Sequence, residues 1–447
     1  MSKHGVFVQE EATALTAPIT GSCSIPVVVG TAPVNMVQNP EEVINTPILA
    51  NSAAEAMAAL GYVDDFENYT LCQMMYATNN IYQVSPAVYI NVLDPTKHKK
   101  ALTETTATVS QMQAKISTKG IIPKGLVVKA ASATLTAGTD YTTEFDTDGS
   151  LIVNLIEGGK GASATSITVS GNVLDPSMIT KTDIVGAYNA STGKESGLEV
   201  VRQVYPKLGV VPGLIVAPGW SQIPEVGIAM SAKAANINGV FKAVALVDLD
   251  TTKATKYTDC KKTKEDSGFT SAFCYPTWPC VKVGDYVFAM SAVVAALIAY
   301  TDASNDDVPS LSPSNEMLGV TGTCLADGTE VTLDQDQGST VNTYGVATAI
   351  NMNGWKLWGN YTGAFPSSGD AKDIWLAVRR MFNWHGNNFI QTYFEKVDDP
   401  MNHVLIESII DSENIRCAAY APDKWAGAEM QYLASDNPIT DTLAGKI

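Results

Sequence analysis

Charged residues are scarce in this sequence, and basic ones are the scarcest. They form 17% of the 447 residues, and 29 basic side chains against 46 acidic ones leave a formal net charge of −17. Because phosphate binding needs clustered lysine and arginine, this balance excludes nucleic acid as the main partner. The hydrophobic content of 45% supports several cores, and the low charge indicates that polar-poor surface becomes buried against partners.

The residues that usually hold metals or carry out catalysis are also few. Seven cysteines are scattered without a C-x-x-C, which is typical of reduced thiols in a cytosolic protein. None of the four histidines lies at metal-ligand spacing from a cysteine or glutamate. The glycine patterns of dinucleotide-binding and P-loop proteins are missing. We therefore expect no metal and no cofactor.

Long apolar runs and targeting signals are missing as well. The most apolar run, residues 286–300, is shorter than the roughly 20 residues that span a bilayer, so we predict a buried helix there. The first ten residues carry no basic-plus-apolar signal. These observations predict a protein made in the cytoplasm, without direct membrane insertion.

Two enzyme-like positions are present. Ser221 lies between a predicted strand and a predicted helix, as in a nucleophile elbow, but Ile223 replaces the second glycine that the elbow requires. Asp248 and Asp250 close a buried strand, where ligands often bind in α/β enzymes, yet no histidine lies nearby in the sequence. A structural turn and a capped loop explain both positions better, so we assign no catalytic residue. An α/β hydrolase-like or nucleotide-binding enzyme remains an alternative.

Buried strands alternate with helices along much of the chain. We predict strands at residues 25–30, 87–93, 213–217 and 241–249, and helices at 52–60, 70–81, 198–208, 224–235 and 286–299. This order predicts a three-layer α/β domain from residues 25–96 and 184–344. Between them, residues 97–183 are rich in Thr, Ser and Gly, with short alternating segments and glycine turns, which predicts an inserted small all-β domain. Its start, residues 97–100, is interpreted as a solvated linker.

Residues 345–447 are predicted to form a C-terminal α+β domain. An aromatic strand leads into a helix over residues 370–396, whose apolar positions share one face. Those positions are Ile374, Val378, Met381, Phe382 and His385. A second helix follows Pro400, and residues 428–433 are predicted as a strand. This region is interpreted as a docking platform. Residues 1–24 form an arm with a strand-like Gly5-Val6-Phe7-Val8, which must pair with a sheet edge.

Several stretches together resemble the tail sheath proteins of contractile bacteriophages and related injection particles. They are residues 4–10, 25–33, 214–221, 243–248, 312–322 and, most strongly, Trp358-Gly-Asn360, Val378-Arg-Arg-Met-Phe382 and Asp398-Asp-Pro-Met-Asn402. They cover most of the chain outside residues 97–183, where such proteins vary. Sheath chains of this kind continue past Asn437 and Pro438 into a further strand, whereas this sequence stops at Ile447.

The resemblance implies a structural subunit, not an enzyme, that stacks as six-fold rings in a helical array around an inner tail tube protein. It implies contraction that drives the tube through the target envelope, with baseplate and tail terminator proteins as further partners. The particle would be a phage tail or a tailocin, assembled in the host bacterial cytoplasm. Another self-assembling shell or surface-layer protein is the second alternative.

The resemblance also implies which residues make the contacts between subunits. The donated strand is expected at Gly5, Val6, Phe7, Val8 and Gln9. The acceptor sheet is expected at Met430, Tyr432 and Leu433. A tube-facing helix is expected to present Lys372, Arg379 and Arg380.

Overall fold

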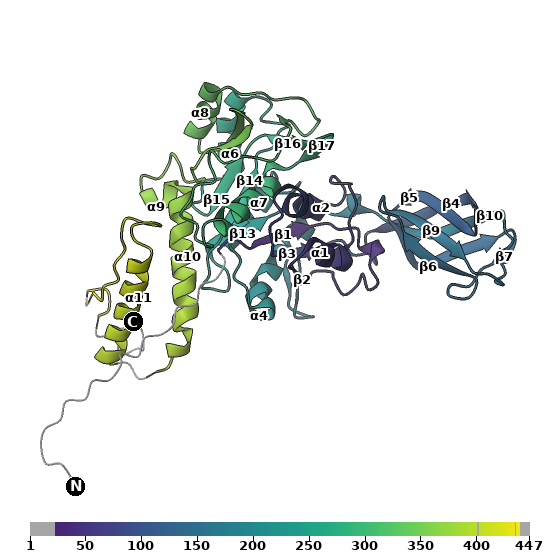
Figure 1. Ribbon diagram of the computed structural model, residues 1–447, viewed down its shortest axis with the longest axis horizontal. Coiled ribbons are helices and arrows are strands. Elements are labelled where there is room, and N and C mark those ends of the chain that lie inside the picture. The colour runs from purple at the N-terminus through teal and green to yellow at the C-terminus, as the bar shows by residue number, and fades with distance from the viewer. Residues whose placement is uncertain (1–22, 400–401, 434, 439–447) are drawn as a thin grey trace, which may run out of the picture. The chain divides into compact units, whose positions relative to one another are not determined.

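The computed structural model describes residues 23–399, 402–433 and 435–438 (Figure 1). The chain divides into two compact units, one of Ser22–Trp384 and one of Met1–Gly21 with His385–Ile447. Each is described by itself below. The proposed donor residues 5–9 lie outside the described residues.

A six-stranded sheet forms the centre of the first unit, in the order β15-β14-β13-β1-β3-β2. Its strands are β1 (Pro26–Gly30), β2 (Pro47–Ala50), β3 (Ala87–Asn91), β13 (Leu214–Val216), β14 (Val244–Asp248) and β15 (Cys274–Thr277). All neighbours pair in parallel except β2, which is antiparallel at one edge. Strands β1, β3 and β14 are buried at every position, so both faces of the sheet are covered, as the continuous apolar runs predict.

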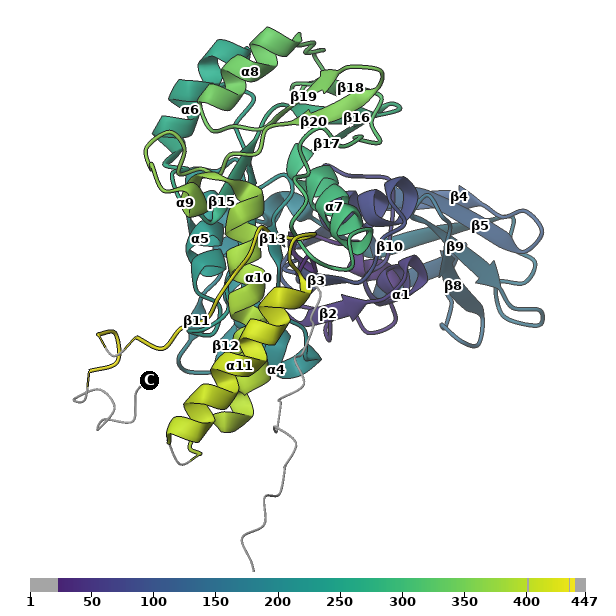
Figure 2. The same cartoon turned by 60° about the vertical axis from the view of Figure 1, so that its left-hand side comes forward.

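Helices pack against this sheet, and Figure 2 shows α5 (Pro224–Ala235) and α7 (Met290–Ala303) on opposite sides of β13. Helix α1 (Ala53–Leu60) begins as predicted, with the Glu55 N–H donating to the Ser52 hydroxyl at 3.2 Å. The other helices around the sheet are α2 (Leu71–Tyr76), α3 (Lys181–Val185) and α4 (Val204–Leu208). The mixed α/β class predicted from the sequence is thus present.

Several predicted elements differ from the structure. The helix expected over 70–81 is α2 followed by a π-helical turn (Ala77–Ile81), and the one over 198–208 begins as a 3-10 helix (Gly197–Gln203). The run at 286–299 opens with β17 (Tyr286–Phe288) because that strand pairs with β16 (Cys280–Val283), which also pairs with β18 (Gly322–Cys324).

Two short helices were not predicted. They are α6 (Cys260–Ser267) and α8 (Gln335–Thr343). Asp334 caps α8 by accepting the Gln337 N–H at 2.8 Å, and Gln337 returns a bond to the Asp334 backbone. This capping box was visible in the sequence and could have identified the helix.

The inserted segment consists of strands, as predicted. One sheet has the order β4-β10-β6-β7 and the other β5-β9-β8. Their bounds are β4 (Lys99–Thr108), β5 (Gln113–Lys119), β6 (Ile121–Ala130), β7 (Ala133–Thr134), β8 (Tyr141–Phe145), β9 (Ser150–Leu155) and β10 (Ser166–Leu174). The inward-facing apolar side chains of both sheets form one core. The stretch interpreted as a linker is corrected in part, because Lys99 and Lys100 open β4 and pair with β10.

The C-terminal elements begin with a hairpin of β19 (Thr348–Asn351) and β20 (Trp355–Trp358). The single helix predicted over 370–396 is instead α9 (Ala371–Ile374), α10 (Leu376–Tyr393) and a 3-10 turn (Phe394–Lys396). It breaks at Trp375 because that residue is extended and bridges to Tyr361. Helix α11 (His403–Ala419) follows, capped by Asn402. Among the described helices, none is long and apolar enough to cross a membrane.

Candidate functional site

The enzyme-like residues come together at the end of the central sheet. Ser221 follows β13 and donates its hydroxyl proton to the Asp248 carboxylate at 2.7 Å, while the Asp248 N–H donates to the same hydroxyl at 3.0 Å. Asp248 also accepts from the Thr277 hydroxyl at 3.0 Å, and from the Ser291 N–H and hydroxyl at 2.9 and 2.5 Å. The carboxylate is therefore occupied by four groups, and Ser221 is fully buried. The pair joins β13, β14, β15 and α7, and is not arranged as a nucleophile and base.

A cleft of about 580 Å³ lies beside this pair, at the carboxyl ends of β13 and β14. Its walls are acidic, with Asp64, Asp65, Glu67, Asp250 and Asp285 among the lining residues. Strand β1 lies between β3 and β13, so the chain reverses direction across the sheet at this point, where α/β enzymes bind ligands. The lining residues in the described part of the chain include no histidine. The cleft thus lies where α/β enzymes bind ligands, but its described lining residues do not form a nucleophile–base pair.

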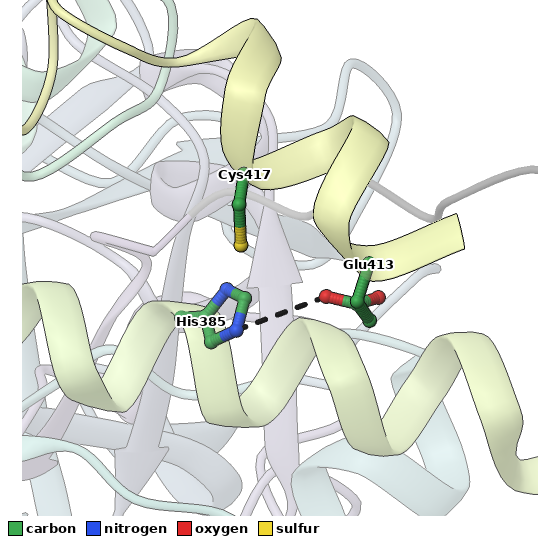
Figure 3. A group of neighbouring side chains, drawn as sticks. All are labelled: His385, Glu413 and Cys417. Atoms are coloured by element: carbon green, nitrogen blue, oxygen red, sulfur yellow. Dashed lines mark ion pairs between the residues drawn. The ribbon is translucent and has the colours of Figure 1, made fainter. Parts of the chain in front are cut away.

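Three groups that could ligate a metal converge between α10 and α11 in the second unit (Figure 3). The ligand atoms of His385, Glu413 and Cys417 lie within 4.8 Å of one another. Arg416 already occupies this cluster, since its Nη2 lies 3.2 Å from His385 Nδ1 and its Nη1 lies 3.4 Å from Glu413 Oε1. The guanidinium supplies the positive charge that a metal would bring.

The protonation states in this cluster agree with a structural role. Burial, together with the Arg416 charge, lowers the pKa of His385 to about 4, so the imidazole is neutral at pH 7. Burial also raises the pKa of the Cys417 thiol, and metal binding requires the thiolate. The cluster is a polar contact between α10 and α11, with Glu413, Arg416 and Cys417 buried.

The first half of α10 has an exposed side and a buried side. Val378 is 37% exposed and Phe382 56%. The buried side carries Arg379 at 8% and Arg380 at 3% exposed, together with the apolar Leu376 and Trp384. Val378 and Phe382 form the exposed apolar stripe of α10, and the docking platform predicted from the sequence stays a prediction. The burial of Arg379 and Arg380 corrects the expectation that these two side chains face outward. Lys372 is partly exposed and forms ion pairs with Asp370 and Asp373.

The buried arginines hold α10 to the core of the first unit. Arg380 forms a two-pronged ion pair with the fully buried Asp302 of α7, with Nη1 and Oδ1 at 3.1 Å. The Cys23 thiol donates to the same carboxylate at 3.3 Å. Arg379 lies over the ring of Phe273, 5.1 Å from its centroid. These partners could not be predicted from local sequence patterns, because they are 78 residues or more apart in the chain.

The proposed acceptor residues belong to the second unit, and the structure corrects their predicted secondary structure. Residues 428–433 are not a strand, since no described segment of the chain pairs with them. The Asn414 side chain bonds the Met430 backbone instead, donating to its carbonyl at 3.2 Å and accepting its N–H at 2.7 Å. Tyr432 and Leu433 are 37% and 49% exposed. Residues 428–433 thus have the composition of a strand but pair with no strand in the described part of the chain.

Curated proteins of related sequence are tail sheath proteins. That of Burkholderia phage BcepMu is 26% identical over 430 residues, which cover 92% of this chain and 85% of that protein. A prophage major tail sheath protein of Pseudomonas aeruginosa is 30% identical over 209 residues, or 44% of this chain and 48% of that protein. No protein-family model matches the sequence.

Solved structures of contractile sheaths share the fold. The helical sheath of the anti-feeding prophage in its contracted state aligns with a TM-score of 0.54 at 14% identity, over 96% of this chain and 87% of that one. The contracted sheath complex of the PVC extracellular contractile injection system aligns with a TM-score of 0.53 at 13% identity, over 94% and 82%. The chain is therefore similar in sequence to a phage tail sheath protein along nearly its whole length, and it shares its fold with contractile sheath structures.

Proposed function

We propose that this sheath subunit polymerises in six-fold rings stacked helically around an inner tube, and that the array shortens to drive the tube through a target envelope. The sequence match to a phage tail sheath protein over 92% of the chain is the observation that carries this proposal. The anti-feeding prophage neighbours come from a contracted helical sheath and from a baseplate, which supports baseplate proteins as partners. Tail tube and terminator proteins are the other proposed partners, in a phage tail or tailocin assembled in the host cytoplasm.

The proposed architecture has four parts. Residues 1–24 are the linking arm, 25–96 with 184–344 the three-layer α/β sheath domain, 97–183 the inserted β domain and 345–447 the α+β assembly domain. Strand order and burial in the six-stranded sheet support the second part, and the two short sheets at 99–174 support the third. The exposed Tyr432 and Leu433 support an acceptor role for residues 430–433, which lack a partner strand in the described chain.

Expression of the chain alone tests this function directly. Negative-stain electron microscopy should show hollow tubes with helical striation, in the shortened form, because no inner tube or baseplate holds the array extended. Adding the tube protein during assembly should produce longer-pitch filled tubes. Flat sheets or closed shells would contradict the proposal and favour the surface-layer alternative.

We further propose that the tube-facing surface of α10 is its exposed apolar stripe, with Lys372 at its edge. Val378 and Phe382 lie at i and i+4, so they share one side of the helix. The Arg379 guanidinium lies 5.6 Å from the Phe382 ring centroid, which helps to fix that exposed ring. The polar contacts of Arg380 and of Asn383, whose amide donates to the Ala243 carbonyl at 3.1 Å, hold the opposite side in the core.

Replacing Phe382 with serine should lower co-assembly with the tube protein by roughly ten-fold without unfolding the subunit, because an exposed aromatic anchor is lost. Pelleting of sheath with purified tube protein measures the effect, and circular dichroism confirms the fold. Leu311→Ser is the matched control, since Leu311 is also exposed, at 47%, but lies outside the stripe. Equal co-assembly of the Phe382 variant and the wild type would contradict the assignment.

A further inference from the structure

Two free cysteines face each other across neighbouring strands of the first unit. Cys280 opens β16 and Cys324 closes β18, and the antiparallel register pairs these residues directly. Directly opposed residues in antiparallel strands point to the same face, with Cβ atoms roughly 4.5–5.5 Å apart. A disulfide needs Cβ atoms about 3.5–4.5 Å apart, so a small approach of the strands brings the two sulfur atoms into bonding range.

The surroundings make one of the two thiols reachable and keep the other enclosed. Cys280 is partly exposed and lines the acidic cleft beside Asp248, whereas Cys324 is fully buried. Burial raises the pKa of both thiols, and the nearby Asp248 adds to this effect at Cys280. The Lys282 ammonium opposes the rise in the pKa of Cys324. Both thiols therefore react slowly, and thiol–disulfide exchange requires prolonged exposure to an oxidant.

We propose that Cys280 and Cys324 form a latent disulfide site, which closes on exchange with a small-molecule disulfide that enters the cleft. The Cys280 thiolate attacks one sulfur of the oxidant, releasing one thiolate and leaving a mixed disulfide. The Cys324 thiolate then attacks the Cys280 sulfur and expels the second half of the oxidant. Two protein thiols and one small disulfide become one protein disulfide and two small thiols, so protons and electrons balance.

The bond would link β16, which precedes α7 in the sequence, to β18, which follows it. It would close a covalent loop containing all of Met290–Ala303, the helix that packs against β13 and β14 and supplies Ser291 to Asp248. Cross-links of this kind stabilise a fold by restricting its unfolded chain. The two thiols would stay reduced in a reducing cell interior and would form the disulfide in an oxidising medium. The bond would therefore stabilise the subunit only after the particle has been released from the cell.

Incubation of the folded full-length chain with oxidised glutathione, followed by alkylation under denaturing conditions and mass spectrometry, tests the site. The number of alkylated cysteines should fall by two from the total of seven, and a digest should contain one cross-linked pair joining residues 280 and 324. The oxidised protein should unfold at a temperature several degrees higher than the reduced one, and a reducing agent should reverse the shift.

Single variants make the result specific. Cys280→Ser and Cys324→Ser should abolish both the cross-link and the thermal shift, whereas Cys274→Ser, which removes a buried cysteine of the neighbouring strand β15, should leave both intact. Full alkylation of all seven cysteines after prolonged oxidation would overturn the proposal. So would a stable glutathione adduct on Cys280 without the internal bond, or a cross-link between any other pair.

Discussion

A subunit truncated to begin at residue 22 should remain folded and monomeric and should form no tubes. The arm has too few apolar residues to form a core of its own, and its Val6–Val8 stretch can gain backbone hydrogen bonds by adding to a sheet edge. Removing it should therefore abolish polymerisation. The cut leaves the core intact, because the Cys23 thiol still donates to Asp302 and Ser24 stays buried before β1. Analytical ultracentrifugation and negative-stain microscopy measure the loss.

Proline substitutions within the full-length chain separate strand addition from simple loss of length. Val6→Pro removes a backbone donor and blocks pairing in the middle of the expected strand, so it should reproduce the truncation. Ala14→Pro changes the arm outside that strand, in a stretch that already contains proline, and should assemble normally. Normal tubes from the truncated chain, or equal defects in the two proline variants, would refute a donated strand at residues 5–9.

Replacing Asp302 with alanine should lower the free energy of unfolding by about 3–5 kcal/mol, because Arg380 would be left as an unpaired buried cation. The side chains of Asp302 and Arg380 are 0% and 3% exposed, so water cannot replace the lost partner. The same change removes one of the two acceptors of the Cys23 thiol, the other being the Asp307 carbonyl. Chemical denaturation followed by circular dichroism measures the change.

Two control variants bracket this result. The double change Asp302→Leu with Arg380→Met removes both charges and should restore much of the lost stability, because an apolar pair needs no compensation. Lys372→Ala breaks only the partly exposed pairs with Asp370 and Asp373 and should leave the unfolding midpoint unchanged. A midpoint for Asp302→Ala equal to that of the wild type would show that the buried pair does not hold α10.

The sequence and the structure agree most closely where the local pattern and the burial have the same cause. The continuous apolar runs before Gly30 and Asp248 predict strands covered on both faces, and both strands are fully buried. Ser52 predicts the start of α1 because a hydroxyl at that position accepts a helical N–H, and the bond is present. The helix predicted over 370–396 is interrupted because a residue outside it changes the local backbone conformation. Trp375 is extended and forms a β-bridge with Tyr361.

By itself the sequence determined the class of protein: a low-charge, acidic chain with α/β alternation, an inserted β segment, a core-less arm and sheath-like motifs. Only the tertiary structure decided which surface of α10 is free. Helical periodicity shows which side chains of α10 share a side. It cannot reveal that Arg380 forms an ion pair with Asp302, a buried residue far away in the sequence. Because a buried ion pair is stable only when both charges meet, that contact turns the arginines inward and leaves Phe382 outside.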